Sequence, residues 1–196
     1  MFNDRTSLHR HLTTRRSGKA RDMIAPGPNA IQLANIIALA SRTPDHGKLA
    51  PWRFIIINDD QRAALATLLK QSWIAENPGA ADQNLSALDQ FAHQAPALIV
   101  LASTPVQPHK IPVWEQQLSA GAVAMNLIHA AHAHGFVANW LTGWAAYSPH
   151  VTSAFGLSGE DRIAGYFFIG TPSRELEERP RPDLAAVISQ WTPPVN

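Results

Sequence analysis

The 196-residue sequence contains no cysteine. Disulfide bonds, iron–sulfur clusters, cysteine-ligated zinc sites and thiol nucleophiles are therefore excluded, and the composition fits a reducing cytoplasm. The sequence also contains no run of about 18 apolar residues and no apolar N-terminal segment typical of a signal peptide. We therefore expect a soluble, cytoplasmic protein that does not bind a membrane.

Charged side chains are scarce. They make up 16% of the sequence, whereas an average globular domain contains about 25%. Because hydrophobic residues reach 45%, we interpret the deficit as a sign that part of the surface is buried against a second copy, in a homodimer. The net charge of +1 lacks the basic excess of a dedicated nucleic-acid-binding protein, so no nucleic-acid partner is expected.

The common nucleotide-binding and hydrolase motifs are missing as well. The two Gly-Lys pairs, Gly18-Lys19 and Gly47-Lys48, are not followed by Ser or Thr, so neither forms a P-loop. No G-x-G-x-x-G follows a candidate strand, and neither the G-x-S-x-G elbow nor H-E-x-x-H occurs. A functional site must therefore be built from residues scattered along the chain.

Hydrophobic periodicity predicts alternating helices and strands within a single domain over residues 1–196. Helices are expected over 6–14, from about 28 to 41, and over 61–75, 82–94, 113–134 and 149–155. Strands are expected over 52–57, 97–102, 136–141 and 162–169, and a further strand or short helix over 185–191. This order predicts an α+β fold of three layers, with helices on both faces of one mixed sheet.

Two of these elements are unusually apolar. Residues 97–102 form a continuous apolar hexamer, which is typical of a central strand covered on both faces. The helix over 113–134 is small and apolar on nearly every side. A helix of this kind belongs in the middle of a structure or of an assembly.

A short basic element follows the first predicted helix. Arg15, Arg16, Ser17 and Lys19 place three cations and a hydroxyl within five residues. Guanidinium groups bind phosphate through paired hydrogen bonds, and an ammonium supplies a compact positive charge. A solvated basic turn is the plainer alternative for these residues alone. However, residues 1–23 contain six basic groups and two acidic ones, and this local excess indicates that an anion binds here.

A second polar segment, over residues 41–54, follows the next predicted helix. It contains Arg42, Asp45, His46 and Lys48 between prolines, in a place where α/β proteins commonly hold ligands. Asp45 also suits a purely structural role as the cap of a turn.

The histidines at 129, 132 and 134 are a poor metal site, because helix positions two apart point to different faces. We therefore predict no metal site.

Four motifs, taken together and in order, resemble the FMN-dependent nitroreductase family. They are Arg15-Arg16-Ser17-x-Lys19, the loop Arg42-x-Pro44-Asp45-His46-Gly47 with Pro51-Trp52-Arg53-Phe54, the helix start Trp114-Glu115-Gln116 with Ser119-Ala120-Gly121, and Gly170-Thr171-Pro172. The resemblance spans most of the chain and is greatest to the short NAD(P)H nitroreductase subgroup, which lacks the helical insertions of longer members. It implies a nitroreductase-like fold, with the long helix at the core of a homodimer and the flavins between the subunits.

The resemblance also implies cofactor-binding roles for particular residues. Arg15 and Ser17 match positions that contact the FMN phosphate and ribityl chain, Arg16 lies beside them, and Lys19 matches a cation near the flavin N1 and O2 edge. The following residues match other parts of the flavin site: Arg42 and His46, which reach the flavin from the neighbouring subunit; Trp140, Leu141 and Thr142, which line the isoalloxazine face; and Arg179 or Arg181, which complete the phosphate site. Leu141 and Thr142 stand where this subgroup has Arg and Ser.

The implied activity is that of an FMN-dependent NAD(P)H oxidoreductase that reduces nitroaromatics, quinones or related small-molecule acceptors. Hydride from NADH or NADPH reaches flavin N5 and then the acceptor at one site in turn, which gives ping-pong kinetics and requires no catalytic side chain. Two alternatives remain open on the sequence alone. One is a flavin enzyme of the same fold with other chemistry, such as dehalogenation or flavin cleavage, and the other is a non-catalytic flavin- or metal-binding module.

Overall fold

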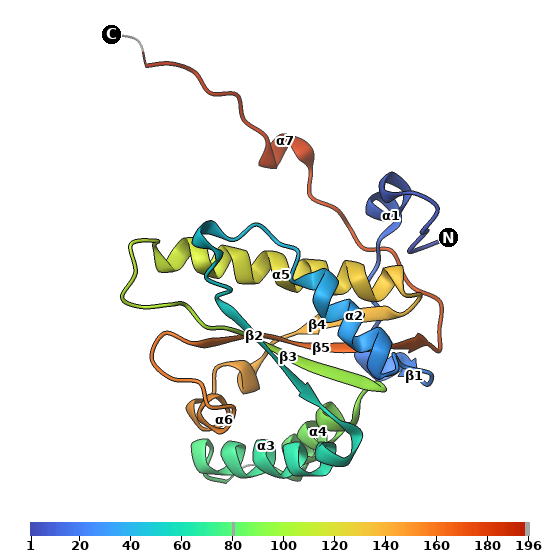
Figure 1. Cartoon of the computed structure of the whole chain (residues 1–196). Helices are drawn as coiled ribbons and strands as arrows, with labels where there is room; N and C mark the ends of the chain where they lie inside the picture. Colours follow the sequence, from blue (N-terminus) through green and yellow to red (C-terminus); the bar gives the residue numbers. More distant parts are fainter. Residues whose placement is uncertain (80, 195–196) are drawn as a thin grey trace.

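The computed structural model describes residues 1–79 and 81–194. Its centre is a sheet of five strands: β1 (Met23–Ile24), β2 (Trp52–Ile57), β3 (Ala97–Ser103), β4 (Val137–Leu141) and β5 (Arg162–Pro172). β5 pairs with β1, β3 and β4, and β2 extends the sheet beyond β3. The longest strand therefore lies in the middle of the sheet, and it carries most of the pairings (Figure 1).

Every pairing between these strands is antiparallel, so the prediction of a mixed sheet is wrong. The connections explain the difference. Between β2 and β3 the chain forms two helices, α3 (Arg62–Glu76) and α4 (Asp82–His93), which return it to the end of the sheet that it left. The single helix α5 (Val113–Ala133) joins β3 to β4, and these two strands do run in the same direction, but β5 lies between them.

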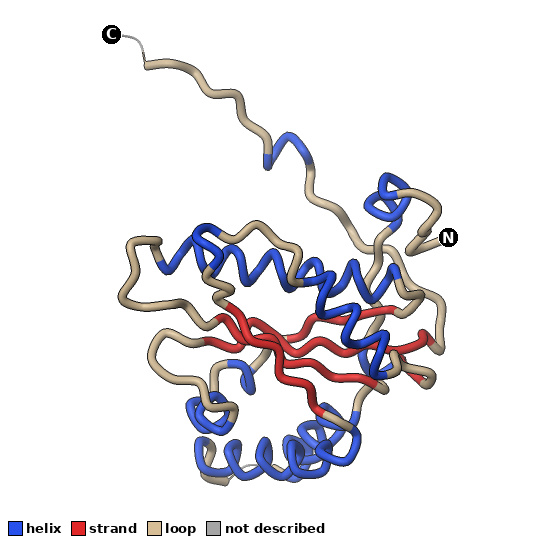
Figure 2. Tube along the Cα trace, in the orientation of Figure 1, coloured by secondary structure: helices blue, strands red, loops and turns tan. Residues whose placement is uncertain are grey.

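Helices cover both faces of this sheet, as predicted. Successive residues of β5 point to opposite faces, because side chains alternate along a strand. Tyr166 and Phe168 pack against the layer that contains α3 and α4, whereas Phe167 and Ile169 pack against α2 (Ala30–Ala40) and α5. All four side chains are fully buried. Figure 2 shows the strands between these two helical layers, with α6 (Pro149–Ala154) on the same side as α3.

The predicted helices and strands are present. They could be predicted because local sequence signals mark their ends. Asn29 and Gln32 form a capping box at the start of α2, and Ser148 caps α6 ahead of Pro149. The expectation for residues 185–191 is met by the short helix α7 (Leu184–Val187). The strand β1 was not expected, because a two-residue strand is too short to show a periodic pattern.

The 21-residue helix α5 is less uniformly buried than its composition predicts. Val123, Ala124 and Leu127 face the sheet and are fully buried. Trp114 and Leu118, near the other end of the helix, are 67% and 54% exposed. A Cβ atom added at Gly121 would have no atom within 4 Å. The helix therefore buries one face in this chain and leaves an apolar stretch uncovered.

Both α1 (Leu8–Thr14) and α7 lie on the side of the sheet that α5 covers (Figure 1). α1 lies near one end of α5, and the segment after β5 passes the N-terminal residues before α7 leads it away from the sheet. β1 connects these regions, since Met23 pairs with Pro172 and the amide of Ser173 donates to the carbonyl of Asp22 at 2.9 Å. Among the described helices, none is both long and apolar enough to cross a membrane.

The packing of Trp140 on β5 gives a test of this fold. A Cβ atom at Gly165 would collide with the indole of Trp140, whose Nε1 donates to the carbonyl of Ala164 at 2.9 Å. We expect Gly165→Ala to lower the free energy of unfolding by about 1–3 kcal/mol, measured in urea, because the ring must move. In a Trp140→Ala background the same substitution should cost much less. An equal cost in both backgrounds would contradict this packing.

Candidate functional site

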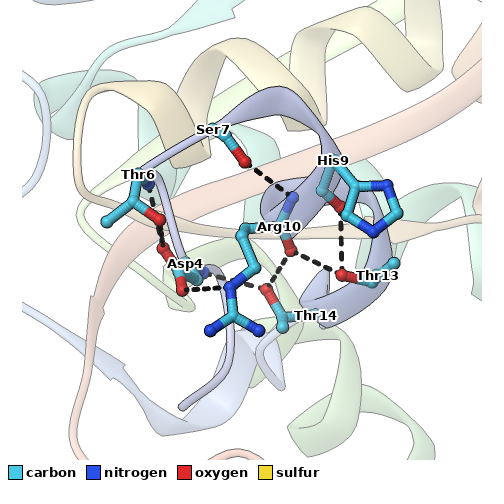
Figure 3. Close-up of polar contacts among 7 residues, drawn as sticks. All are labelled: Asp4, Thr6, Ser7, His9, Arg10, Thr13 and Thr14. Carbon is cyan, nitrogen blue, oxygen red and sulfur yellow. Dashed lines mark hydrogen bonds and ion pairs between the residues drawn. The ribbon is translucent and has the colours of Figure 1, made fainter.

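The basic element begins where α1 ends, and a polar network fixes this part of the chain. The Ser7 hydroxyl caps α1 by accepting from the amide of Arg10 at 3.1 Å. Asp4 accepts from the Thr6 hydroxyl at 2.6 Å and pairs with Arg10 at 3.6 Å, and the amide of Asp4 donates to the Thr14 hydroxyl at 3.0 Å (Figure 3). Hydrogen bonds from Thr6 hold the pKa of Asp4 below its usual value. Residues 4–14 therefore form one hydrogen-bonded unit.

Asn3 extends this network to the basic element itself. Its Oδ1 accepts from the amide of Arg16 at 2.8 Å, and its Nδ2 donates to the carbonyl of the same residue at 3.1 Å. Gly18 is held from the other side, because its amide donates to the carbonyl of Ala138 and its carbonyl accepts from Nδ2 of Asn139. The backbone of residues 16–18 is thus fixed between the N-terminal segment and β4.

A group of histidines joins α1 to α5. His11 is the only buried side chain of α1, and its Nε2 lies 2.7 Å from Nδ1 of His129. The ring of His132 lies 5.5 Å from that of His11, and neither of its nitrogens has a partner among the described residues. Burial lowers the pKa of all three, that of His132 to about 3, and the nearby positive charge of Arg15 adds to the effect.

These histidines are therefore neutral at pH 7 and hold α1 by packing and a neutral hydrogen bond. The described residues contain no group of three or more His, Cys, Asp or Glu side chains that is arranged to hold a metal ion.

The C-terminal segment brings further charges to the basic element. Nε of Arg16 donates to the carbonyl of Glu177 at 2.7 Å, and Nζ of Lys19 donates to the carboxylate of Glu177 at 3.1 Å. The Glu178 carboxylate lies 3.7 Å from Arg16 and 2.8 Å from Arg181. A cavity of about 60 Å³ lies between the two segments, and its lining includes Arg16, Ser17, Lys19, Glu177 and Arg179.

Arg15, Arg16, Lys19, Arg179 and Arg181 make up what we call the cationic cluster. Partial burial lowers the pKa of Arg15 and of Arg16, and repulsion from Arg181 lowers both further. Among the described residues Arg15 makes no ion pair, and its guanidinium lies 3.5 Å from the hydroxyl of Ser17. Guanidinium groups that are partly desolvated and repel one another bind an anion favourably, because its charge relieves both costs.

The structure separates His46 from this cluster, whereas Arg42 lines a pocket together with His11 and His129. α5 holds their loop: Asn126 donates to the carbonyl of Arg42, and Nδ1 of His46 lies 2.8 Å from the carboxylate of Glu115. Both side chains are exposed. Glu115 precedes His129 by 14 residues on α5, a distance of about 20 Å at 1.5 Å per residue. Asp45 accepts from the amide of Ala50 at 2.7 Å, which is the structural role that the sequence left open.

The segment Trp140, Leu141 and Thr142 lies at the end of β4. Trp140 packs against Phe167, on the face of the sheet that α5 covers, and is 38% exposed. Leu141 packs into the opposite cluster, next to α3 and α6, because neighbouring strand residues alternate. Thr142 is exposed. The side chains of Trp140 and Leu141 therefore do not share one face.

The structure thus brings Arg179 and Arg181 to Arg15, Arg16, Ser17 and Lys19, from which they are separated by about 160 residues of sequence. Four residues of this site were not expected from the sequence. Asn3 and Asn139 hold the backbone of the basic element, and Glu177 and Glu178 pair with its cations. The charged, proline-rich stretch from Arg174 to Asp183 is the sequence feature that could have pointed to the two glutamates, but a solvated segment shows the same pattern.

Because His11, His129 and His132 are neutral in the folded protein, we expect its stability to depend on pH. Between about pH 6.5, the usual pKa of histidine, and the folded-state pKa of about 3, the unfolded chain binds a proton at residue 132 that the folded chain does not. The free energy of unfolding therefore falls as the pH is lowered below about 6.5. We expect His132→Leu to reduce this slope by about 1.4 kcal/mol per pH unit, in urea unfolding at successive pH values.

The exposed His9 of α1 provides the control, because His9→Leu removes an imidazole from the surface (Figure 3). This variant should keep the wild-type slope. A wild-type slope in the His132→Leu variant would contradict a neutral buried His132.

Comparisons with known proteins identify the family of this chain. The sequence model described as "Nitroreductase family" matches residues 14–171. The protein named "Putative NAD(P)H nitroreductase" from Haemophilus influenzae is 39% identical over 171 residues, which cover 87% of this chain and 91% of that protein.

Solved structures show the same fold. The nitroreductase-like family protein from Bacillus cereus matches with a TM-score of 0.79 at 23% identity, over 94% of this chain and 96% of that chain. A nitroreductase in complex with FMN from Exiguobacterium sibiricum, described in its name as putative, matches with a TM-score of 0.69 at 17% identity, over 95% of this chain and 98% of that chain. Since the family model covers most of the sequence, this chain belongs to the nitroreductase family.

Proposed function

We propose that this chain is an FMN-dependent NAD(P)H oxidoreductase that reduces nitroaromatics, quinones or related acceptors. The observation that carries the proposal is the cationic cluster, which the fold builds from both ends of the chain around the motif that first resembled a flavin-phosphate site. Family membership supports it, as do the NAD(P)H in the name of the Haemophilus relative and the FMN in the Exiguobacterium structure.

The cluster suits the phosphate of FMN. A phosphate carries a charge of about −2 near neutral pH and presents several acceptor oxygens. Arg15 offers a guanidinium with no ion pair among the described residues, and the Ser17 hydroxyl beside it adds a neutral donor. Arg181 is close enough to lower the pKa of Arg15. Arg15, Ser17 and Arg181 would therefore hold the phosphate, with Arg16 fixing the backbone and Arg179 close by.

Other residues would contact the ring. Lys19, which lines the cavity between the basic element and the C-terminal segment, would place its positive charge near the flavin N1 and O2 edge, where it favours the reduced anion. Trp140 offers a partly exposed aromatic surface, and Thr142 lies beyond it on the same strand end. Leu141 would take part through its backbone, since its side chain lies in the opposite core.

The bound flavin would supply the redox chemistry, by accepting hydride from NADH or NADPH at N5 and passing it to the acceptor in a ping-pong sequence. The side chains of this chain would bind the anionic tail, orient the ring and stabilise negative charge. None of these side chains would transfer a proton.

The same proposal includes a homodimer. The uncovered apolar stretch of α5 and the distance of His46 from the cationic cluster both support it, because Arg42 and His46 are then available to the flavin of the second subunit. The low charge of the sequence is a third indication.

The dimer is tested at Gly121. The single chain accommodates a larger residue there, because a Cβ atom would meet nothing within 4 Å. We therefore expect Gly121→Leu to leave the monomer folded but to weaken the dimer, measured by light scattering over a dilution series. Ala64→Leu, on the exposed side of α3, is the matched control and should leave the oligomeric state unchanged. A Gly121→Leu protein with wild-type dimer affinity would exclude this face of α5 as the interface.

The cofactor assignment is tested with the purified protein. We expect the absorption band of an oxidised flavin, bleached by NADH or NADPH. Arg15→Ala should weaken FMN binding about 10- to 100-fold, since a charge-assisted hydrogen bond contributes about 1.5–3 kcal/mol. Arg21→Ala removes the same charge from an exposed site nearby and should change affinity little.

The outcomes separate the alternatives. A protein that binds no flavin would overturn the proposal. A bound flavin that neither NADH nor NADPH bleaches would instead favour other flavin chemistry on the same fold, and acceptor assays under argon and under air would then distinguish dehalogenation from oxygen-dependent flavin cleavage.

A further inference from the structure

Two carboxylates of the C-terminal segment lie on the cationic cluster. Glu177 contacts Lys19 at 3.1 Å, and Glu178 contacts Arg181 at 2.8 Å and Arg16 at 3.7 Å. The Glu177 carbonyl also accepts from Nε of Arg16 at 2.7 Å, which holds this part of the segment against the cluster. Two negative charges therefore lie among the cations that suit a phosphate.

The pKa shifts of the arginines and of the two glutamates agree with this placement. Glu178 raises the pKa of Arg15 and of Arg16, against the effects of burial and of Arg181. In return, the hydrogen bond from Lys19 holds the pKa of Glu177 below its usual value. The hydrogen bond from the amide of Arg179 lowers the pKa of Glu178, and the positive charges of Arg181 and Arg16 lower it further.

These ion pairs are easily exchanged. The side chains of Lys19 and Glu177 are 43% and 75% exposed, and that of Glu178 is 57% exposed. Exposed pairs of this kind contribute little to stability, because water and salt screen them. A phosphate dianion forms stronger, paired hydrogen bonds with guanidinium groups. It is therefore able to replace the carboxylates at small cost.

We propose that Glu177 and Glu178 act as an internal anion that occupies the cationic cluster until the phosphate of FMN displaces it. The inference rests on the proposed function, because it concerns the same phosphate site. The two glutamates would be specificity-determining residues. Every incoming anion meets the same competition, so a weakly bound monovalent anion stays out whereas a tightly bound dianion still enters.

The sequence of the tail suits such an exchange. Arg179 and Arg181 alternate with Pro180 and Pro182, and proline restricts the backbone to extended conformations here. The two arginines therefore remain close to the cluster when the carboxylates leave it. Displacement of Glu178 frees the guanidinium of Arg181, which then binds the phosphate in place of the carboxylate.

The test compares two variants that remove the same charge from the same segment. Glu178→Gln removes the carboxylate that pairs with Arg181 and Arg16 but keeps a side-chain oxygen that accepts from the amide of Arg179. Glu175→Gln, three residues earlier, is the control, because Glu175 lines the cavity beside the cluster and makes no ion pair among the described residues. The full-length apoprotein is titrated with FMN, with riboflavin and with inorganic phosphate, at low and at high salt.

We expect Glu178→Gln to bind FMN and inorganic phosphate about two- to fivefold more tightly than the wild type at low salt, the range that an exposed ion pair allows. Its affinity for riboflavin, which has no phosphate, should not change, and Glu175→Gln should resemble the wild type with all three ligands. High salt should remove the gain, because it screens exposed charges.

The inference is overturned if Glu178→Gln binds FMN and phosphate no more tightly than Glu175→Gln, or if riboflavin binding tightens equally. Failure of the proposed function looks different, because then no variant binds FMN. In that case the phosphate titration alone decides whether the carboxylates compete for the cluster.

Discussion

The structure depends on the burial of β5 at the centre of the sheet. Tyr166, Phe167, Phe168 and Ile169 are fully buried and alternate between the two cores, so this one strand joins both helical layers. It also pairs with three other strands. A one-residue shift in its register would exchange the residues of the two cores, and the register is therefore strongly fixed.

The same strand assembles the candidate site. β5 ends at Pro172, where it pairs with β1, and this pairing directs the next residues of the chain along the basic element. The N-terminal half of the site is held mainly by polar contacts, including those of Asn3 and Asn139 and the His11–His129 pair. The hydrophobic core thus positions the two segments, and hydrogen bonds set the detailed geometry between them. This division suits a ligand site, because polar contacts near the surface rearrange at lower cost than a packed core.

Charge is the second constraint on the site. The chain is nearly neutral, yet it concentrates guanidinium groups from both of its ends in one place. Such a concentration raises the free energy of the folded chain unless anions accompany it. The tail supplies Glu177 and Glu178, and an FMN phosphate would supply a stronger partner for the same groups. The cations can pair first with the glutamates and then with a phosphate, because the glutamates are exposed and weakly held.

The helices and most of the strands follow from local features of the sequence, namely the periodicity of apolar residues and the capping signals at Asn29 and Ser148. The sequence by itself also determined the chemistry of the basic element, because Arg15, Arg16, Ser17 and Lys19 are adjacent in the chain. Tertiary structure alone decided that the sheet is antiparallel, since that depends on β5 inserting between β3 and β4.

Tertiary structure also decided that Leu141 faces the core opposite to Trp140 and that Glu177 meets Lys19. These last features are contacts between residues far apart in the sequence or consequences of which strand pairs with which. No local pattern encodes them, because a charged residue in an extended tail has the same sequence signature whether it meets water or another charge.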